Sequence, residues 1–167
     1  RAVQLAEFGV FVTSVFLGVI LSPRPAPAQT QTFDVATGTQ QTVAAPIADG
    51  LTQTSIIKNL GGTLVFSAGN TYTGPTTVSG GTLALDNTNA VADSNALSLT
   101  AAGATLDISN AGGATQGLSL SGVGGSVVYL GANQLSVGTS GGSSTFAGMI
   151  EGAGSVSEAA GASLTLS

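Results

Sequence analysis

The chain contains no cysteine, no histidine and no tryptophan, and charged residues make up only 7% of its 167 residues. The absence of cysteine excludes a disulfide framework. The absence of both histidine and cysteine also excludes the catalytic triads and the usual zinc sites that depend on these side chains. The sequence therefore argues against most nucleophilic and zinc-dependent enzymes, and we expect no cofactor.

Basic residues are also scarce, because Arg1, Arg24 and Lys58 are the only cations and the formal net charge is −5. Nucleic-acid binding requires a basic patch, and three scattered cations do not make one. Hydrophobic residues, in contrast, account for 43% of the chain, which argues against simple disorder. We therefore expect no nucleic-acid partner. The length fits one folded domain.

The stretch from Ser55 to Leu85 has the pattern of short strands separated by turns. Leu64 and Phe66 alternate with neighbours of mixed polarity, and Leu83 and Leu85 repeat the same alternation. The turns are marked by Gly69-Asn70, Gly74-Pro75 and Gly80-Gly81. Alternation with a period of two, bounded by Gly, Asn and Pro, is typical of half-buried strands.

The beginning of this stretch returns 100 positions later, because Ser155–Ser167 aligns with Ser55–Ser67 without a gap. Lys58 aligns with Glu158, and this reversal of charge predicts that the position is solvated. Such internal similarity indicates a repeat protein, and we expect the chain to be a C-terminally incomplete piece of one.

The same strand pattern continues to the end of the chain. Alternating apolar pairs occur at Leu97/Leu99, Leu106/Ile108, Leu118/Leu120, Val128/Leu130, Leu135/Val137 and Leu164/Leu166. Such strands could also build an up-and-down barrel or a sandwich. Their short length, and the absence of the Trp and Cys of an immunoglobulin-like core, favour a solenoid of stacked coils.

A set of short motifs carries a family resemblance. These motifs are Gly62-Thr63-Leu64, Asn70-Thr71-Tyr72-Thr73-Gly74, Thr76-Thr77-Val78 and Gly80-Gly81-Thr82-Leu83. Through them, residues 55–85 resemble the autotransporter-associated β-strand repeat of bacterial surface proteins. Residues 118–156 are also similar to passenger sequences of that family.

The resemblance implies an all-β fold, a right-handed parallel β-helix that forms the passenger region of a protein exported by the type V route. It further implies partners, namely export machinery and a C-terminal outer-membrane β-barrel that is not present in this chain. Residues 51–167 would form the β-helical repeats, and residues 29–50 a polar leader or N-terminal cap. At roughly 22–28 residues per coil, residues 29–167 would make about five or six coils, with Gly and Asn in left-handed conformations at the corners.

The N-terminal segment has the features of a secretory signal peptide, which we predict to be a helix over residues 1–28. An apolar run of fourteen residues spans 8–21, which is shorter than the ~20 residues of a membrane-spanning helix. Ala26 and Ala28 supply the small residues of a cleavage site, with Gln29 as the first residue after it. A buried helix and an uncleaved membrane anchor are the alternatives.

Candidate binding residues are few. Asp86 and Asp93, together with nearby asparagines, could offer oxygen ligands to calcium, but a polar loop is the simpler interpretation. Gly122-Val123-Gly124-Gly125 is followed by neither a helix nor a lysine, so we interpret it as a turn and not a phosphate loop. Tyr72 and Tyr129 could stack on sugars, but we assign Tyr72 to the repeat corner and Tyr129 to a strand face.

The sequence thus predicts a non-enzymatic passenger segment that acts as a β-helical stalk or adhesin scaffold at the cell surface. The ligand of such a scaffold would be a host surface or a glycan, which rows of outward Ser and Thr could contact. The alternatives are a secreted β-helical polysaccharide lyase or hydrolase, and a structural polymer that assembles end to end.

Overall fold

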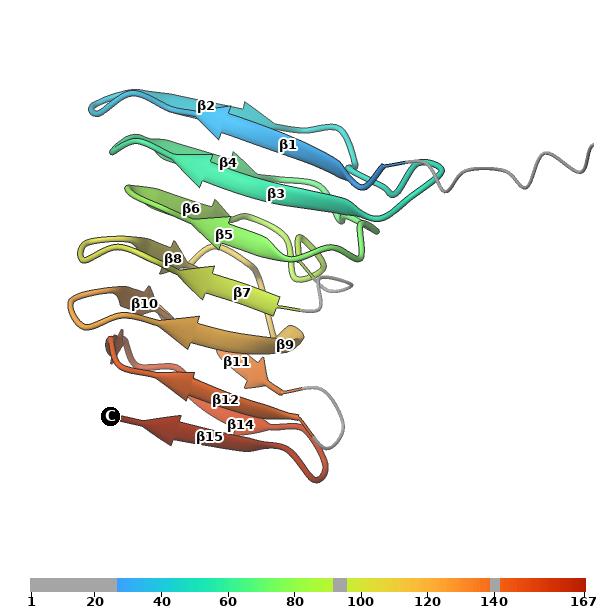
Figure 1. Cartoon of the computed structure of the whole chain (residues 1–167). Helices are drawn as coiled ribbons and strands as arrows, with labels where there is room; N and C mark the ends of the chain where they lie inside the picture. Colours follow the sequence, from blue (N-terminus) through green and yellow to red (C-terminus); the bar gives the residue numbers. More distant parts are fainter. Residues whose placement is uncertain (1–26, 92–95, 139–141) are drawn as a thin grey trace, which may run out of the picture.

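The computed structural model describes residues 27–91, 96–138 and 142–167 of the chain (Figure 1). The apolar run 8–21 and Ala26 of the predicted signal peptide lie outside these residues. Within the described residues no helix is long and apolar enough to cross a membrane. Gln29, the residue that follows the predicted cleavage point, is the first residue of the first strand.

The described elements are strands, and they form two long faces and a shorter third one. The first face contains β1 (Gln29–Asp34), β3 (Thr54–Asn59), β5 (Thr76–Val78), β7 (Ala96–Leu99), β9 (Thr115–Gly122), β12 (Ser143–Phe146) and β15 (Ser163–Leu166). The second face contains β2 (Gln40–Val43), β4 (Thr63–Phe66), β6 (Thr82–Leu85), β8 (Thr105–Asp107), β10 (Val127–Tyr129) and β13 (Met149–Glu151). The third face contains β11 (Gln134–Val137) and β14 (Ser155–Glu158), which join the stack through β9.

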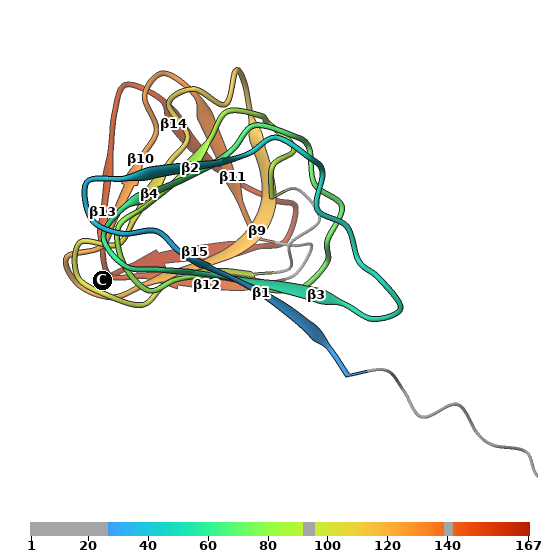
Figure 2. The same cartoon turned by 90° about the horizontal axis from the view of Figure 1, so that it is seen from above.

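These strands build a parallel β-solenoid of about six turns, as the sequence predicted. Consecutive strands of the chain lie on different faces, and each strand pairs in parallel with the strand one coil away, for example β3 with β1 and β5. Seen from above, the coils superpose around a common interior (Figure 2). The described pairings are parallel, which is not the arrangement of an up-and-down barrel or an antiparallel sandwich.

The core consists of apolar ladders that run along the stack. On the second face, Leu64 pairs in register with Leu83, Leu83 with Leu106, and Leu106 with Val128. The side chains of these four residues are completely buried. Each contributes roughly 1.5–3 kcal/mol relative to exposure, so the period-two alternation of the sequence places the main stabilising groups inside every coil.

β9 is the strand at which the third face begins. Its second half pairs with β7, and its last residues, Ser121 and Gly122, also pair with β12. Its first half pairs with β11, where Leu135 lies opposite Thr115 and Val137 opposite Leu118, so β9 carries one extra residue in this interval. Such a bulge bends a strand, and Figure 2 shows β9 curving from one face toward the next.

The two copies of the sequence repeat occupy different faces of the solenoid. The first copy forms β3 on the first face and β4 on the second, whereas the second copy forms β14 on the third face and β15 on the first. Both copies are a strand, a turn and a strand. The repeated sequence therefore specifies the local corner and does not specify its position around the coil.

The corners differ from the prediction in one respect. Several glycines, such as Gly38, Gly103 and Gly125, do have positive φ angles, but Asn70 does not. Among the described residues, the non-glycine residue with a positive φ is Leu60, at 63°. The prediction of a left-handed Asn at the corner is wrong for Asn70, whose side chain instead forms hydrogen bonds to the two neighbouring coils.

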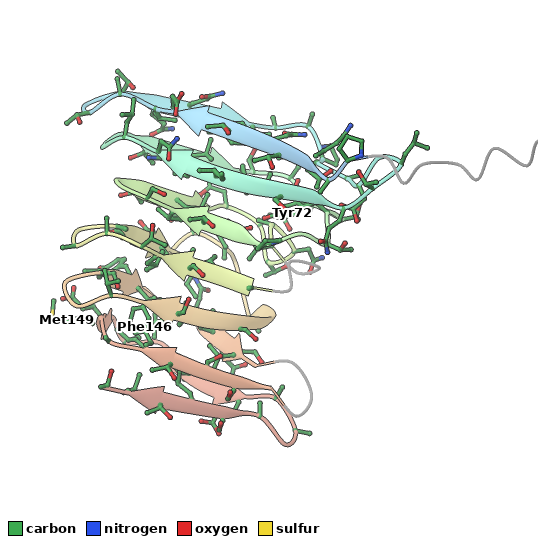
Figure 3. All side chains as sticks on the ribbon, viewed as in Figure 1. Tyr72, Phe146 and Met149 are labelled. Atoms are coloured by element: carbon green, nitrogen blue, oxygen red, sulfur yellow. The ribbon has the colours of Figure 1, made fainter. Side chains whose placement is uncertain are left out.

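Gly122 makes room for the buried ring of Phe146. It pairs in register with Phe146, which is completely buried. A Cβ atom on Gly122 would lie 2.6 Å from Cδ2 of Phe146 and 2.6 Å from Oγ of Ser126, closer than real Cβ contacts. The Phe146 ring in Figure 3 therefore fills space that the absent side chain leaves open.

We predict that Gly122→Ala lowers the free energy of unfolding by about 1–3 kcal/mol, because the added methyl group overpacks the core. Gly124→Ala is the matched control, since a Cβ atom there meets no atom within 4 Å. Chemical denaturation of both variants measures the difference. In the double variant with Phe146→Leu the two effects should be less than additive, and strict additivity would contradict the proposed contact.

Candidate functional site

Part of the motif that the sequence singled out lies at one corner of the solenoid, formed by residues 70–74 and the coils on either side. Asn70 is buried there, and its Oδ1 accepts a hydrogen bond of 2.7 Å from the backbone N–H of Ile47. Its Nδ2 donates to the carbonyl of Ala90, also at 2.7 Å. One amide side chain thus connects three successive coils and satisfies backbone groups that would otherwise be buried unpaired.

Tyr72 points into the solenoid and not toward solvent. Its side chain is 1% exposed, and its hydroxyl lies 2.7 Å from Oγ1 of Thr76, which is completely buried. A buried tyrosine normally pairs its hydroxyl in this way. Tyr72 is therefore a core residue of the corner and presents no face to a sugar.

Asp49 closes the same corner from the preceding coil. Its Oδ1 accepts from the backbone N–H of Thr54 at 2.7 Å, and its Oδ2 accepts from the Thr73 hydroxyl at 2.7 Å. The Thr73 backbone N–H also lies within hydrogen-bond distance of the carboxylate. The bond from Thr54 is the largest cause of the lowered pKa of the Asp49 carboxyl, followed by the bond from the Thr73 hydroxyl.

The motif glycines permit close approach between coils. A Cβ atom on Gly62 would collide with the carbonyl of Ala36, one on Gly74 with the carbonyl of Thr54, and one on Gly81 with the carbonyl of Gly62. Gly81 also has a φ of 63°, which favours glycine. These positions exclude other residues because strand spacing brings neighbouring backbones together.

The remaining motif residues have distinct places around the same coils. Leu64 and Leu83 point into the core, while Thr77 faces outward from β5. Thr71 is exposed, and its backbone forms an isolated parallel bridge with Ala48. The carbonyl of Gly80 accepts a hydrogen bond from Lys58.

Lys58 contradicts the prediction that its position is solvated. Its side chain is 0% exposed, and Nζ donates to the carbonyls of Asn59 at 2.9 Å, Leu60 at 2.8 Å and Gly80 at 2.8 Å. An ammonium group has three donors, so all of them are used. Burial lowers the pKa of Lys58 below its ordinary value of 10.5. The aligned Glu158 is exposed, so the two copies differ in environment as well as in charge.

The sequence does contain a signal for the burial of Lys58. On β3, every second residue faces outward, and the inward positions are Thr54, Ile56 and Lys58. The side chains of Thr54 and Ile56 are completely buried. A strict period of two therefore places Lys58 on the inner face. The long aliphatic stem lies in the core, and the charged end reaches the corner carbonyls.

The outer surface of the first face carries a column of hydroxyl groups. Thr77 pairs in register with Ser98, Ser98 with Ser121, Ser121 with Thr145, and Thr145 with Thr165. The hydroxyls of Ser98 and Ser121 lie 2.9 Å apart. One coil before Thr77 the equivalent residue is Ile57, which has no hydroxyl group. One coil before Ile57 it is Thr32.

Acidic side chains do not assemble into a metal centre in the described part of the chain. No group of three or more Asp or Glu side chains there could hold a metal ion. Asp93, one of the two acids considered for calcium, lies outside the described residues. Gly122–Gly125 ends β9 and enters the turn before β10, as expected for a turn.

One family model matches a segment of the chain that includes this corner. Residues 57–85, which run from β3 through β6, match the family model of the passenger-associated transport repeat. No curated protein matches the chain, and no solved structure matches it.

The fold defines the class of protein as a parallel β-solenoid repeat protein. The match to the transport repeat together with the solenoid fits an autotransporter passenger repeat protein. This repeat family is not known for enzymatic activity, and it implies an exported, surface-associated protein.

We predict that Lys58→Met lowers the free energy of unfolding by about 1–3 kcal/mol, because three corner carbonyls lose their donor. Glu158→Met, at the aligned exposed position, removes one exposed hydrogen bond from the Leu164 N–H and should cost less, about 1 kcal/mol or below. Between the lowered folded pKa and 10.5 the unfolded chain binds more protons, so wild-type stability rises with pH there. Denaturation curves across alkaline pH should show this rise in the wild type and not in Lys58→Met. Equal stability losses in the two variants would contradict the buried role.

We predict that Asp49→Asn destabilises the protein at neutral pH and loses this effect in acid. The folded pKa is lower than the unfolded value near 3.8, so the contribution of Asp49 is fully present above 3.8 and disappears as pH falls through the folded pKa. Denaturation at neutral pH and at decreasing acid pH measures the difference between variant and wild type. Asp86→Asn controls for the change in net charge, and a pH-independent difference for Asp49→Asn would refute the assignment.

Proposed function

We propose that the chain is a non-enzymatic passenger segment of an exported bacterial surface protein and acts as a β-helical stalk or adhesin scaffold. The observation that carries this proposal is the parallel pairing of strands from coil to coil along the stack, into which the transport-repeat segment fits. At ~4.8 Å per coil, about six turns give a rod of roughly 29 Å.

The use of polar residues supports a mechanical role. Asn70, Asp49 and Lys58 direct their polar atoms at the backbones of neighbouring coils, where they tie one turn to the next. A catalytic site would instead direct such groups at a shared space. The alternative is a polysaccharide lyase or hydrolase, and a calcium-dependent lyase would need a cluster of acids of a kind that the described residues do not form.

Localisation and partners follow as parts of the same proposal. The export machinery would deliver the chain to the cell surface, and the hydroxyl column of the first face would be available to a host glycan. The charge-free chemistry of Thr77, Ser98 and Ser121 suits hydroxyl-rich ligands, because each hydroxyl can both donate and accept a hydrogen bond.

The proposal is tested with the full-length gene expressed in its bacterial host and an epitope inserted at Gly38, a turn position with open space around it. We expect antibody and added protease to reach the epitope on intact cells. Purified protein should release no product from polysaccharides. An epitope that is reached only after cell lysis would overturn the surface assignment, and catalytic release of oligosaccharides would overturn the non-enzymatic one.

A further inference from the structure

The outer surface of the second face carries an aromatic side chain between two carboxylates. Tyr129 on β10 pairs in register with Asp107 on β8 and with Glu151 on β13. Because successive parallel strands lie ~4.8 Å apart, both acids are neighbours of Tyr129 on the same surface. All three belong to the outward set of their strands, since Leu106, Val128 and Ile150 beside them point inward.

The adjacent outward column is apolar on β10 and β13, whereas Thr105 occupies it on β8. Val127 lies two residues before Tyr129 on β10 and pairs in register with Met149 on β13. Tyr129 is 43% exposed and Met149 is 56% exposed. Figure 3 shows the Met149 side chain projecting away from the solenoid. We call Asp107, Val127, Tyr129, Met149 and Glu151 the Tyr129 patch.

Charge complementarity decides what fits this patch. Lys58 is the basic residue of the described part of the chain, and it is completely buried, so the charged side chains exposed there are carboxylates. No described cation of the chain can therefore reach Asp107 or Glu151 to neutralise them. A cation that binds at Tyr129 would have an aromatic ring and a carboxylate on each neighbouring strand close to it. Oδ1 of Asp107 also accepts a hydrogen bond of 2.9 Å from the backbone N–H of Ser109.

Arginine suits the patch better than other occupants. Its guanidinium stacks on aromatic rings and pairs with carboxylates, and its aliphatic stem can lie along Val127 and Met149. A second copy of the chain would place its own carboxylates against these, which is unfavourable. A neutral glycan could stack on Tyr129 but gains nothing from the negative charges on both sides.

We propose that the Tyr129 patch is a docking surface for an arginine-bearing segment of a partner protein. The guanidinium stacks on Tyr129 between Asp107 and Glu151, and the apolar column covers the stem of the side chain. This inference goes beyond the role of stalk or scaffold, because the patch would bind such a segment wherever the chain is located.

The chain provides its own probe for this interaction, because Met149 is its only methionine. Protein labelled with ¹³C at the methionine methyl group is titrated with capped hexa-arginine, and the Met149 methyl resonance is followed by NMR. We expect a saturable shift with hexa-arginine and none with hexa-citrulline, which has the same shape but no charge. Equal shifts with both peptides, or no shift with either, would overturn the proposal.

Variants then separate the patch from general attraction to an acidic protein. Tyr129→Ala and Glu151→Gln should each weaken the affinity for hexa-arginine by about three- to ten-fold. Asp86→Asn removes the same charge from an exposed acid outside the patch and should leave the affinity unchanged. Far-ultraviolet circular dichroism verifies that each variant is folded. Equal weakening of the affinity by Asp86→Asn and Glu151→Gln would show non-specific attraction and overturn the proposal. A shift of the methyl resonance with neutral oligosaccharides that hexa-arginine does not displace would identify a glycan site instead, and it would also overturn the proposal.

Discussion

In-register parallel stacking is the constraint on which the rest of this structure depends. Each inward side chain has a neighbour at the equivalent position one coil above and below, so a row such as Leu64, Leu83, Leu106 and Val128 is one continuous packing unit. A large side chain in one coil must be compensated in the next, as Gly122 compensates Phe146. Stability is therefore distributed along the axis, as in other repeat proteins, where each unit depends mainly on its neighbours.

The corners present a different physical problem, because the chain turns there and backbone groups leave the strand ladders. Buried backbone groups must find partners, and in this protein polar side chains supply several of them. Asn70 forms hydrogen bonds to both neighbouring coils. The Asp49 carboxylate accepts hydrogen bonds from the backbone N–H groups of Thr54 and Thr73. Lys58 donates hydrogen bonds to three carbonyls. The conspicuous polar residues of the repeat are thus committed to structure, which agrees with a scaffold and leaves recognition to the outer faces.

Those outer faces differ in chemistry. The first face presents neutral hydroxyls, whereas the lower part of the second face presents Tyr129 and Met149 with Asp107 and Glu151. The burial of Lys58 is what makes the described surface uniformly acidic or neutral. The acidic excess of the composition and the burial of Lys58 together leave the described exterior without an exposed cation.

The sequence by itself predicted the short strands and the inward rows, because a period of two between Gly and Asn turns is a local property that survives in any context. Its resemblance to a repeat family added the parallel solenoid, which the alternation alone left open. It also located the corner at Asn70–Gly74. Only the tertiary structure decided the face on which each strand lies, the branching at β9, the bridging role of Asn70 and the burial of Lys58. These depend on contacts between residues 20 to 25 positions apart, as the hydrogen bonds between coils show. Local alternation records which residues point inward, but it carries no information about which carbonyl a lysine meets one coil away.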